Sequence, residues 1–191
     1  MTPSQSKRLQ SRLGVRADGD IGRETLAALF VKAGADAERA AELALAANVH
    51  FRVYGILDRP LRLAHFMAQV IHESGSFLYM EEIASGAAYE NRIDLGNLRA
   101  GDGMRYKGRG PIQLTGRGNY RLVGRALGID LESHPSIAAV PSIGMLTACY
   151  FWSFNGLNIL ADADDILRIT RRVNGLADRK LHLAQMKDLL F

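Results

Sequence analysis

Residues 60–77 have the sequence Pro60-Leu-Arg-Leu-Ala-His-Phe-Met-Ala-Gln-Val-Ile-His-Glu-Ser-Gly-Ser-Phe77. Apolar side chains recur three and four residues apart from Leu61 to Ile71, which predicts an amphipathic helix with its proline in the first turn. Gly75 is expected to end that helix. The sequence therefore predicts a buried helix that stops abruptly at a carboxylate, Glu73.

Glu73 flanks the apolar stripe of this helix. Partial burial disfavours a charged carboxyl group, and so does the negative end of a helix dipole. Both effects should raise the pKa of Glu73, as a general acid near neutral pH requires. The residues alone leave open a second interpretation, a solvent-exposed glutamate at a helix end.

Further carboxylates follow at Glu81, Glu82 and Glu90. On one continuous helix, Glu82 would lie about 13.5 Å from Glu73. Gly75 and Ser76 permit a chain reversal that brings Glu81 or Glu82 back across a cleft. Carboxylates roughly 6.5–9.5 Å apart are the arrangement of inverting glycosidases. Surface charge is the alternative for all three residues.

The rest of the chain predicts a mainly α protein, because little of it alternates apolar and polar residues. A glycine-rich loop is expected over residues 83–111, and loops of that length are usually functional. Asp36 is expected to cap a helix. Helices are expected within residues 5–30 and over residues 36–49, 60–72, 119–127, 142–153, 164–173 and 177–190.

Composition is that of a globular protein: 191 residues, 48% hydrophobic, net charge +4. This mild positive charge suits an anionic partner without selecting one. The single cysteine, Cys149, excludes an internal disulfide and a cysteine-rich zinc site. His65 and His72 lack the His-Glu-x-x-His spacing, so neither a metal nor another cofactor is expected. The apolar stretch 137–154 is interrupted by Pro141 and Gly144 and predicts a core helix instead of a membrane span.

Residues 106–120 are basic, aromatic and rich in glycine. They lack the spacing of a phosphate-binding loop. Gln113, Thr115 and Asn119 could bind sugar hydroxyls or a water, while Tyr106 and Tyr120 could stack on sugars or pack in the core. A nucleic-acid interface is a competing interpretation of the cations Lys107, Arg109, Arg117 and Arg121.

These segments together resemble glycoside hydrolase family 19, in particular its phage endolysin and tailocin branch. The resemblance covers about residues 40–190 and is carried by three ordered motifs, namely His72-Glu-Ser-Gly75, Tyr106-Lys-Gly-Arg-Gly-Pro-Ile-Gln-Leu-Thr115 with Asn119-Tyr120, and Arg172-Val-Asn-Gly175. It implies a lysozyme-like fold with a cleft between two lobes. It also implies inverting hydrolysis of β-1,4 bonds in peptidoglycan, or in chitin.

The resemblance also implies roles for individual residues. Glu73 matches the general acid, Glu82 the base and Thr115 the residue that positions the attacking water. Glu81 and Glu90 still compete with Glu82 for the role of base. The cleft residues implied are Tyr106, Gln113, Asn174 and, as a late arginine of the family pattern, Arg179.

Two departures favour bacterial wall over chitin as the substrate. The long insertion between the two glutamates and the disulfides of the chitinase branch are both missing. The resemblance then implies a monomer that binds peptidoglycan strands, without nucleic acid or membrane insertion. No signal peptide is expected, so the protein would stay cytoplasmic until release to the periplasmic wall. A chitinase and a non-catalytic glycan-binding protein remain the alternatives.

Residues 1–35 are interpreted as a separate small helical segment before a catalytic domain over residues 36–191. Leu9-Gln10, Leu13-Gly14, Asp18-Gly19, Ile21-Gly22 and Thr25-Leu26 look like part of a three-helix peptidoglycan-binding repeat. The segment is either a truncated wall-binding module or an integral part of the catalytic domain.

Overall fold

The computed structural model describes residues 1–173 and 179–191. In these ranges the chain is mainly α, as predicted, and extended pairing is limited to isolated bridges of Arg109 with Glu81 and Leu114. The α-helices are α1 (Pro3–Leu13), α2 (Arg23–Lys32), α3 (Ala37–Val53), α4 (Pro60–Glu73), α5 (Asp102–Arg105), α6 (Arg117–Leu127), α7 (Pro141–Phe154), α8 (Leu157–Asp162), α9 (Ile166–Val173) and α10 (Lys180–Leu190).

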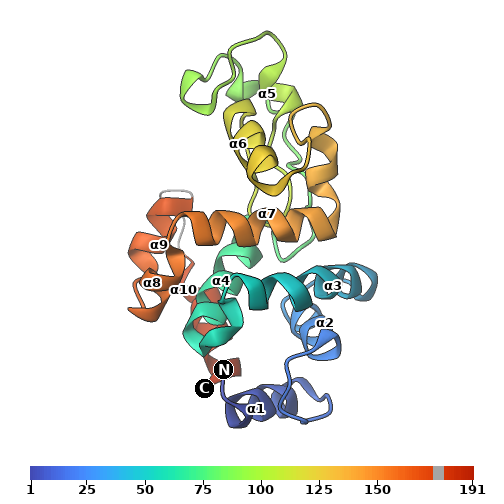
Figure 1. Cartoon of the computed structure of the whole chain (residues 1–191), viewed down its shortest axis with the longest axis vertical. Coiled ribbons are helices and arrows are strands. Elements are labelled where there is room, and N and C mark those ends of the chain that lie inside the picture. The colour runs from blue at the N-terminus through green and yellow to red at the C-terminus, as the bar shows by residue number, and fades with distance from the viewer. Residues whose placement is uncertain (174–178) are drawn as a thin grey trace.

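Two lobes meet along α7, which crosses the middle of the molecule in Figure 1. The larger lobe holds α1–α4 and α8–α10 around one hydrophobic cluster. The smaller lobe holds α5, α6 and the glycine-rich loop around a second cluster. Met145, Ala148 and Trp152 of α7 belong to the first cluster, and Ile143 and Tyr150 pack against the second. This explains why α7 is apolar on several faces.

The sequence did not predict the short helices α5 and α8, and α6, α9 and α10 begin two or three residues away from their predicted starts. α8 is short and begins after Gly156, which adopts a positive φ of 64°. α9 begins at residue 166, two residues later than predicted, and α10 begins at residue 180. The predicted loop over residues 83–111 contains α5 and two single-turn 3-10 helices, η2 (Ala87–Tyr89) and η3 (Ile93–Leu95).

The end of α4 makes the predicted chain reversal. Gly75, Ser76 and Phe77 all adopt positive φ, and the amide of Ser76 donates to the carbonyl of Ile71. The chain then runs beside the glycine-rich segment, where Gly110 N donates to Met80 O at 2.8 Å. The reversal therefore carries the residues after α4 from the larger lobe to the smaller one.

The N-terminal helices pack into the core of the larger lobe. Leu9 of α1 and Leu26, Leu29 and Phe30 of α2 are fully buried members of its cluster. Asp36 caps α3 as predicted, because its side chain accepts from Arg39 N. Residues 1–35 are thus structurally continuous with the larger lobe, and wall binding by them stays a prediction.

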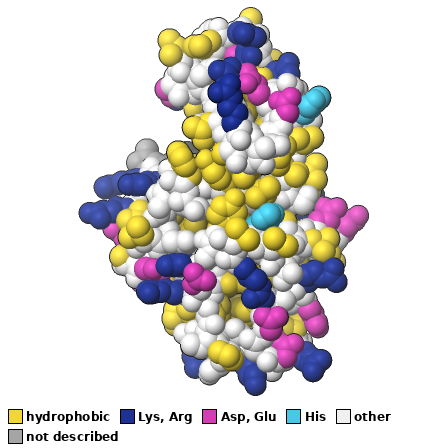
Figure 2. Space-filling view, in the orientation of Figure 1, with side chains coloured by type: hydrophobic (Ala, Val, Ile, Leu, Met, Phe, Trp, Pro, Cys, Tyr) yellow, Lys and Arg dark blue, Asp and Glu magenta, His cyan; other side chains and the backbone are white. Residues whose placement is uncertain are grey.

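Hydrophobic side chains gather over the middle of the face in Figure 2, with charged groups more frequent toward both ends. Within residues 1–173 and 179–191, no helix has both the length and the apolar character needed to cross a bilayer.

Candidate active site

A cleft of about 590 Å³ lies where the two lobes meet. The larger lobe contributes Glu73, at the last position of α4, and the smaller lobe contributes Glu82. Three polar residues predicted from the glycine-rich segment also line this cleft, namely Gln113, Thr115 and Asn119. The structure therefore brings both predicted carboxylates to one cavity.

Glu73 is largely buried and forms an ion pair with Arg179, whose side chain is fully buried. The Glu73 side chain is only 6% exposed. The sequence-based expectation for Glu73 considered burial and the helix dipole alone. The structure adds a neighbouring cation, which favours the ionised carboxylate and so acts in the opposite direction. Arg179, the first residue described after the gap at 174–178, is thus in contact with the predicted acid.

Glu82 is held by two hydrogen bonds from the smaller lobe. Tyr89 Oη donates to Glu82 Oε1 at 3.0 Å, and Gly108 N donates to Oε2 at 3.1 Å. The backbone amide of Glu82 in turn donates to the Gly108 carbonyl at 2.9 Å. These contacts fix the carboxylate in the cleft with lone pairs still available to accept a proton.

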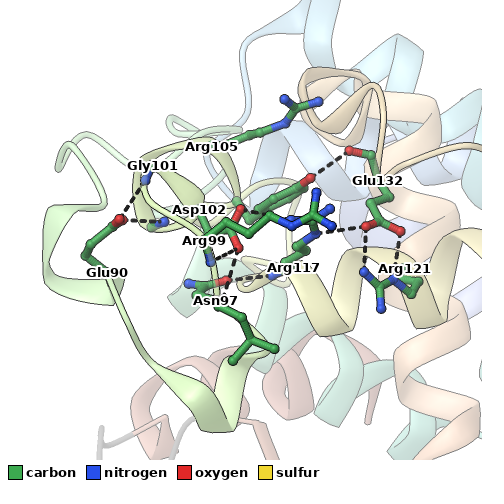
Figure 3. Close-up of polar contacts among 12 residues, drawn as sticks. Glu90, Asn97, Arg99, Gly101, Asp102, Arg105, Arg117, Arg121 and Glu132 are labelled. Atoms are coloured by element: carbon green, nitrogen blue, oxygen red, sulfur yellow. Dashed lines mark hydrogen bonds and ion pairs between the residues drawn. The ribbon is translucent and has the colours of Figure 1, made fainter.

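The two competing carboxylates lie elsewhere. Glu81 forms ion pairs with Lys107 and Arg109, each at 3.1 Å. Although partial burial opposes its ionisation, the hydrogen bonds and charges of these two cations hold the pKa of Glu81 below its usual value. Glu90 accepts hydrogen bonds from Gly101 N and Gly103 N, and so secures the glycine-rich loop (Figure 3). Neither residue lines the cleft.

Thr115 lies beside Glu82. A methyl group built on Gly108 would lie 3.3 Å from both Glu82 Oε2 and Thr115 Oγ1, and 2.5 Å from Gln113 Oε1. The three side chains therefore surround one point that only a glycine leaves open. Thr115 Oγ1 donates its proton to the Gln113 carbonyl at 2.9 Å. Its oxygen can consequently accept a hydrogen bond from a water in the cleft beside Glu82.

The two tyrosines predicted as sugar-stacking candidates are core residues instead. Tyr106 and Tyr120 are buried and pack against each other in the smaller lobe, with their rings tilted by 59°. Tyr106 Oη donates to the Glu132 carbonyl, and Tyr120 Oη donates to the Lys107 carbonyl. Burial raises the pKa of Tyr120 to about 12, despite the neighbouring Arg109. Their hydroxyl groups thus face protein partners instead of the cleft.

The positive charges of the predicted cation cluster are neutralised by carboxylates within the smaller lobe. Lys107 and Arg109 pair with Glu81, while Arg117 and Arg121 pair with Glu132 (Figure 3). The two arginines lower the pKa of Glu132 to about 2, Arg121 having the larger effect. Cations held in this way are poorly placed to neutralise the phosphates of a nucleic acid.

Asn174, a predicted sugar-binding residue, lies outside the described residues. Within residues 1–173 and 179–191, no three or more His, Cys, Asp or Glu side chains are grouped as metal ligands would be. His65 and His72 each contact a protein side chain. The His65 ring contacts Asp164 at 2.7 Å, and the His72 ring packs against His182.

Four aromatic residues that line the cleft were not predicted from the sequence, namely Tyr89, Tyr150, Phe151 and Phe154. Tyr89 follows Glu82 by seven residues, and no periodic pattern in the loop marks it. Tyr150 and Phe154 are four residues apart on α7, which was interpreted as a core helix. Their rings are stacked with centroids 5.6 Å apart.

Residues 59–165 match the family model described as chitinase class I, of glycoside hydrolase family 19. The chain belongs to glycoside hydrolase family 19. The matched range contains Glu73, Glu82 and Thr115, and more than half of the chain. The family 19 assignment confirms the family, though not the branch, that the sequence motifs suggested.

Relatives in family 19 include plant and bacterial proteins. The chain is 36% identical to endochitinase At2g43610 of Arabidopsis thaliana over 132 residues, which cover 69% of this chain and 45% of that protein. It is 29% identical over 146 residues to a glycosyl hydrolase family 19 domain-containing protein of Haemophilus influenzae, covering 60% of this chain and 71% of that one. The chain thus spans less than half the length of the Arabidopsis endochitinase.

Solved family 19 structures have the same fold. Chitinase C of Streptomyces griseus superposes with a TM-score of 0.70 at 22% identity, covering 90% of this chain and 95% of that one. The class IV chitinase of Zea mays gives 0.66 at 24% identity, covering 89% and 92%. The expected lysozyme-like, mainly α fold is therefore confirmed.

Proposed function

We propose that this protein hydrolyses β-1,4 glycosidic bonds of N-acetylglucosamine chains of the chitin type, with inversion. The observation that carries the proposal is the cleft shared by Glu73 and Glu82, one carboxylate from each lobe, with Thr115 beside Glu82. Two carboxylates on opposite sides of a cleft can act as acid and base on one glycosidic bond.

In this mechanism Glu73 protonates the leaving glycosidic oxygen. Glu82 removes a proton from a water that is hydrogen-bonded to Thr115 Oγ1, and the water attacks the anomeric carbon from the opposite face. Arg179 stabilises the carboxylate that remains on Glu73 after the proton has left. Gln113 and Asn119 provide amide groups for the sugar hydroxyls.

The relatives support chitin over peptidoglycan as the main substrate, since several of them are named endochitinases. The sequence departures that favour bacterial wall keep peptidoglycan as the second candidate. These are the short spacing between Glu73 and Glu82 and the single Cys149, which excludes internal disulfides. A wall-degrading role of the endolysin type would use the same two carboxylates.

The test compares the parent protein with Glu73→Gln and Glu82→Gln on chitin hexamer, and on chloroform-permeabilised Gram-negative cells. Each variant should lose about 10²–10⁴-fold in kcat, and the first product should be the α-anomer. Glu81→Gln is the matched control, because Glu81 lies outside the cleft, and it should keep most of the activity. Full turnover by Glu73→Gln, or a β-anomeric first product, would contradict the mechanism. Clearing of cells without cleavage of chitin would select the second substrate.

A further inference from the structure

One wall of the cleft is aromatic and exposed. Phe154 of α7 is 63% exposed, and its ring lies nearly parallel to that of Tyr150, at an interplanar angle of 22°. Leu122 of α6, 44% exposed, lines the same cleft. Large apolar side chains exposed inside a concave, polar-edged site are typical of ligand-binding surfaces.

Polar groups border these rings. Asn119 and Asn155 both line the cleft. Each uses its Nδ2 within the protein, Asn119 toward the Thr115 carbonyl and Asn155 toward the Phe151 carbonyl. The Oδ1 atom of each asparagine can therefore accept a hydrogen bond from a ligand hydroxyl or amide. An aromatic face beside neutral hydrogen-bonding groups matches a pyranose ring, which has an apolar face and polar edges.

The charged residues along the cleft further restrict the class of sugar that the aromatic wall can bind. Among the described residues that line it, the charged ones are Glu73, Glu82 and Arg92. Arg92 already forms a two-point ion pair with Asp94, at 2.8 and 2.6 Å. The aromatic wall itself thus lacks a charged partner in the described lining. Arg172 lies beside this wall, but it already donates to the Asn155 carbonyl at 2.8 Å. Among the described residues of the lining, an anionic substituent on the sugar would therefore lose hydration without gaining an ion pair.

We infer that Tyr150, Phe154 and Leu122 form a stacking platform for an unsubstituted N-acetylglucosamine unit of the glycan, and that this platform favours chitin-type chains over chains with lactyl carboxylates. The inference rests on the proposed function, because it concerns the same cleft. It assigns to α7 a part in substrate selection in addition to its part in the core.

The test measures glycan binding by calorimetry in the Glu82→Gln background, so that no ligand is cleaved. Phe154→Ala and Phe154→Leu should each weaken binding of chitin hexamer by roughly 3- to 10-fold, because stacking needs a ring face. Phe154→Tyr keeps the ring and should stay within about twofold of the parent background. Tyr79→Ala, an exposed aromatic residue outside the cleft lining, is the matched control.

A second glycan tests whether the platform selects chitin-type chains. Peptide-free peptidoglycan strands of similar length should bind more weakly than chitin hexamer, and the Phe154 variants should change their affinity less. An equal loss of affinity for both glycans would contradict the proposed selection of chitin-type chains. Unchanged binding of chitin hexamer by Phe154→Ala and Phe154→Leu would overturn the platform itself, with the proposed function intact. A background protein that binds neither glycan, together with a parent protein that cleaves neither, would overturn both proposals.

Discussion

At the scale of single residues, the candidate base depends on neighbours that are distant in the sequence. Gly108, 26 residues after Glu82, donates to one of its carboxylate oxygens, and Tyr89 donates to the other. Hydrogen bonds to a charged group are stronger than those between neutral groups. The tyrosine hydroxyl therefore orients the carboxylate that we propose as the base.

Tyr89→Phe removes this donor and keeps the ring. We expect kcat on chitin hexamer to fall about tenfold, because a hydrogen bond to a charged group contributes about 1.5 kcal/mol. KM should change little, since the substrate contacts remain. Steady-state kinetics of the variant and of Tyr79→Phe, an exposed tyrosine away from the cleft, measure the effect. Equal losses in both variants would point to a general effect on folding and argue against orientation of Glu82.

At the scale of elements, α7 joins the two lobes through a close contact with the glycine-rich segment. A methyl group built on Gly144 would lie 2.9 Å from both the Ala138 carbonyl oxygen and Pro111 Cδ. It would also lie 3.0 Å from Gly110 Cα. The chain from residue 110 leads directly to Gln113 and Thr115, so this contact positions two groups of the cleft.

Gly144→Ala should therefore destabilise the protein, although alanine is a better helix former than glycine. The overpacking costs about 1–3 kcal/mol and outweighs a propensity gain of about 1 kcal/mol or less. We also expect a lower kcat, because residues 110–115 must move to accommodate the methyl group. Urea unfolding and hydrolysis of chitin hexamer measure the two effects. Ser153→Ala, at an exposed site on the same helix, should change neither, and a Gly144→Ala protein as stable as the parent would refute the contact.

At the scale of the whole molecule, residues 1–35 support the turn that follows Glu73. The Phe30 ring packs edge-on against Phe77, with centroids 5.3 Å apart. A methyl group on Gly34 would lie 2.8 Å from Ser76 Cβ, so the two backbones are in close contact. Ser76 and Phe77 form the reversal that carries the chain toward Glu82. The N-terminal helices thus belong to the packing behind the cleft.

Deletion of residues 1–35 should abolish hydrolysis of soluble chitin hexamer, not only binding to an insoluble wall. Phe30→Ala should lower the free energy of unfolding by about 3–5 kcal/mol, because it opens a cavity beside Phe51 and Phe77. Val31→Ala, at an exposed site in the same helix, should have little effect. Thermal unfolding and activity measurements test both changes. A fragment of residues 36–191 that folds cooperatively with full activity would show that the segment is an independent module.

Much of this organisation could be predicted from local patterns. The spacing of apolar residues predicted α4 and its end at Glu73, and Gly75-Ser76 predicted the reversal. Tyr106 and Tyr120 could not be placed in this way, because a tyrosine beside glycines suits a sugar-binding surface and a small core equally well. Tyr150 and Phe154 of α7 could not be assigned to the cleft from the sequence, because an apolar helix that packs against two lobes has no clear polar face.

The sequence by itself determined the helical class, the family and the carboxylates available for chemistry, because these depend on spacing along the chain and on motif order. Only the tertiary structure decided which carboxylates share the cleft. It paired Glu81 with Lys107 and Arg109, bound Glu90 to the amides of Gly101 and Gly103, and left Glu82 in the same cleft as Glu73. The physical reason is that ion pairs and hydrogen bonds between residues distant in the chain form only once the folded glycine-rich loop brings those residues together.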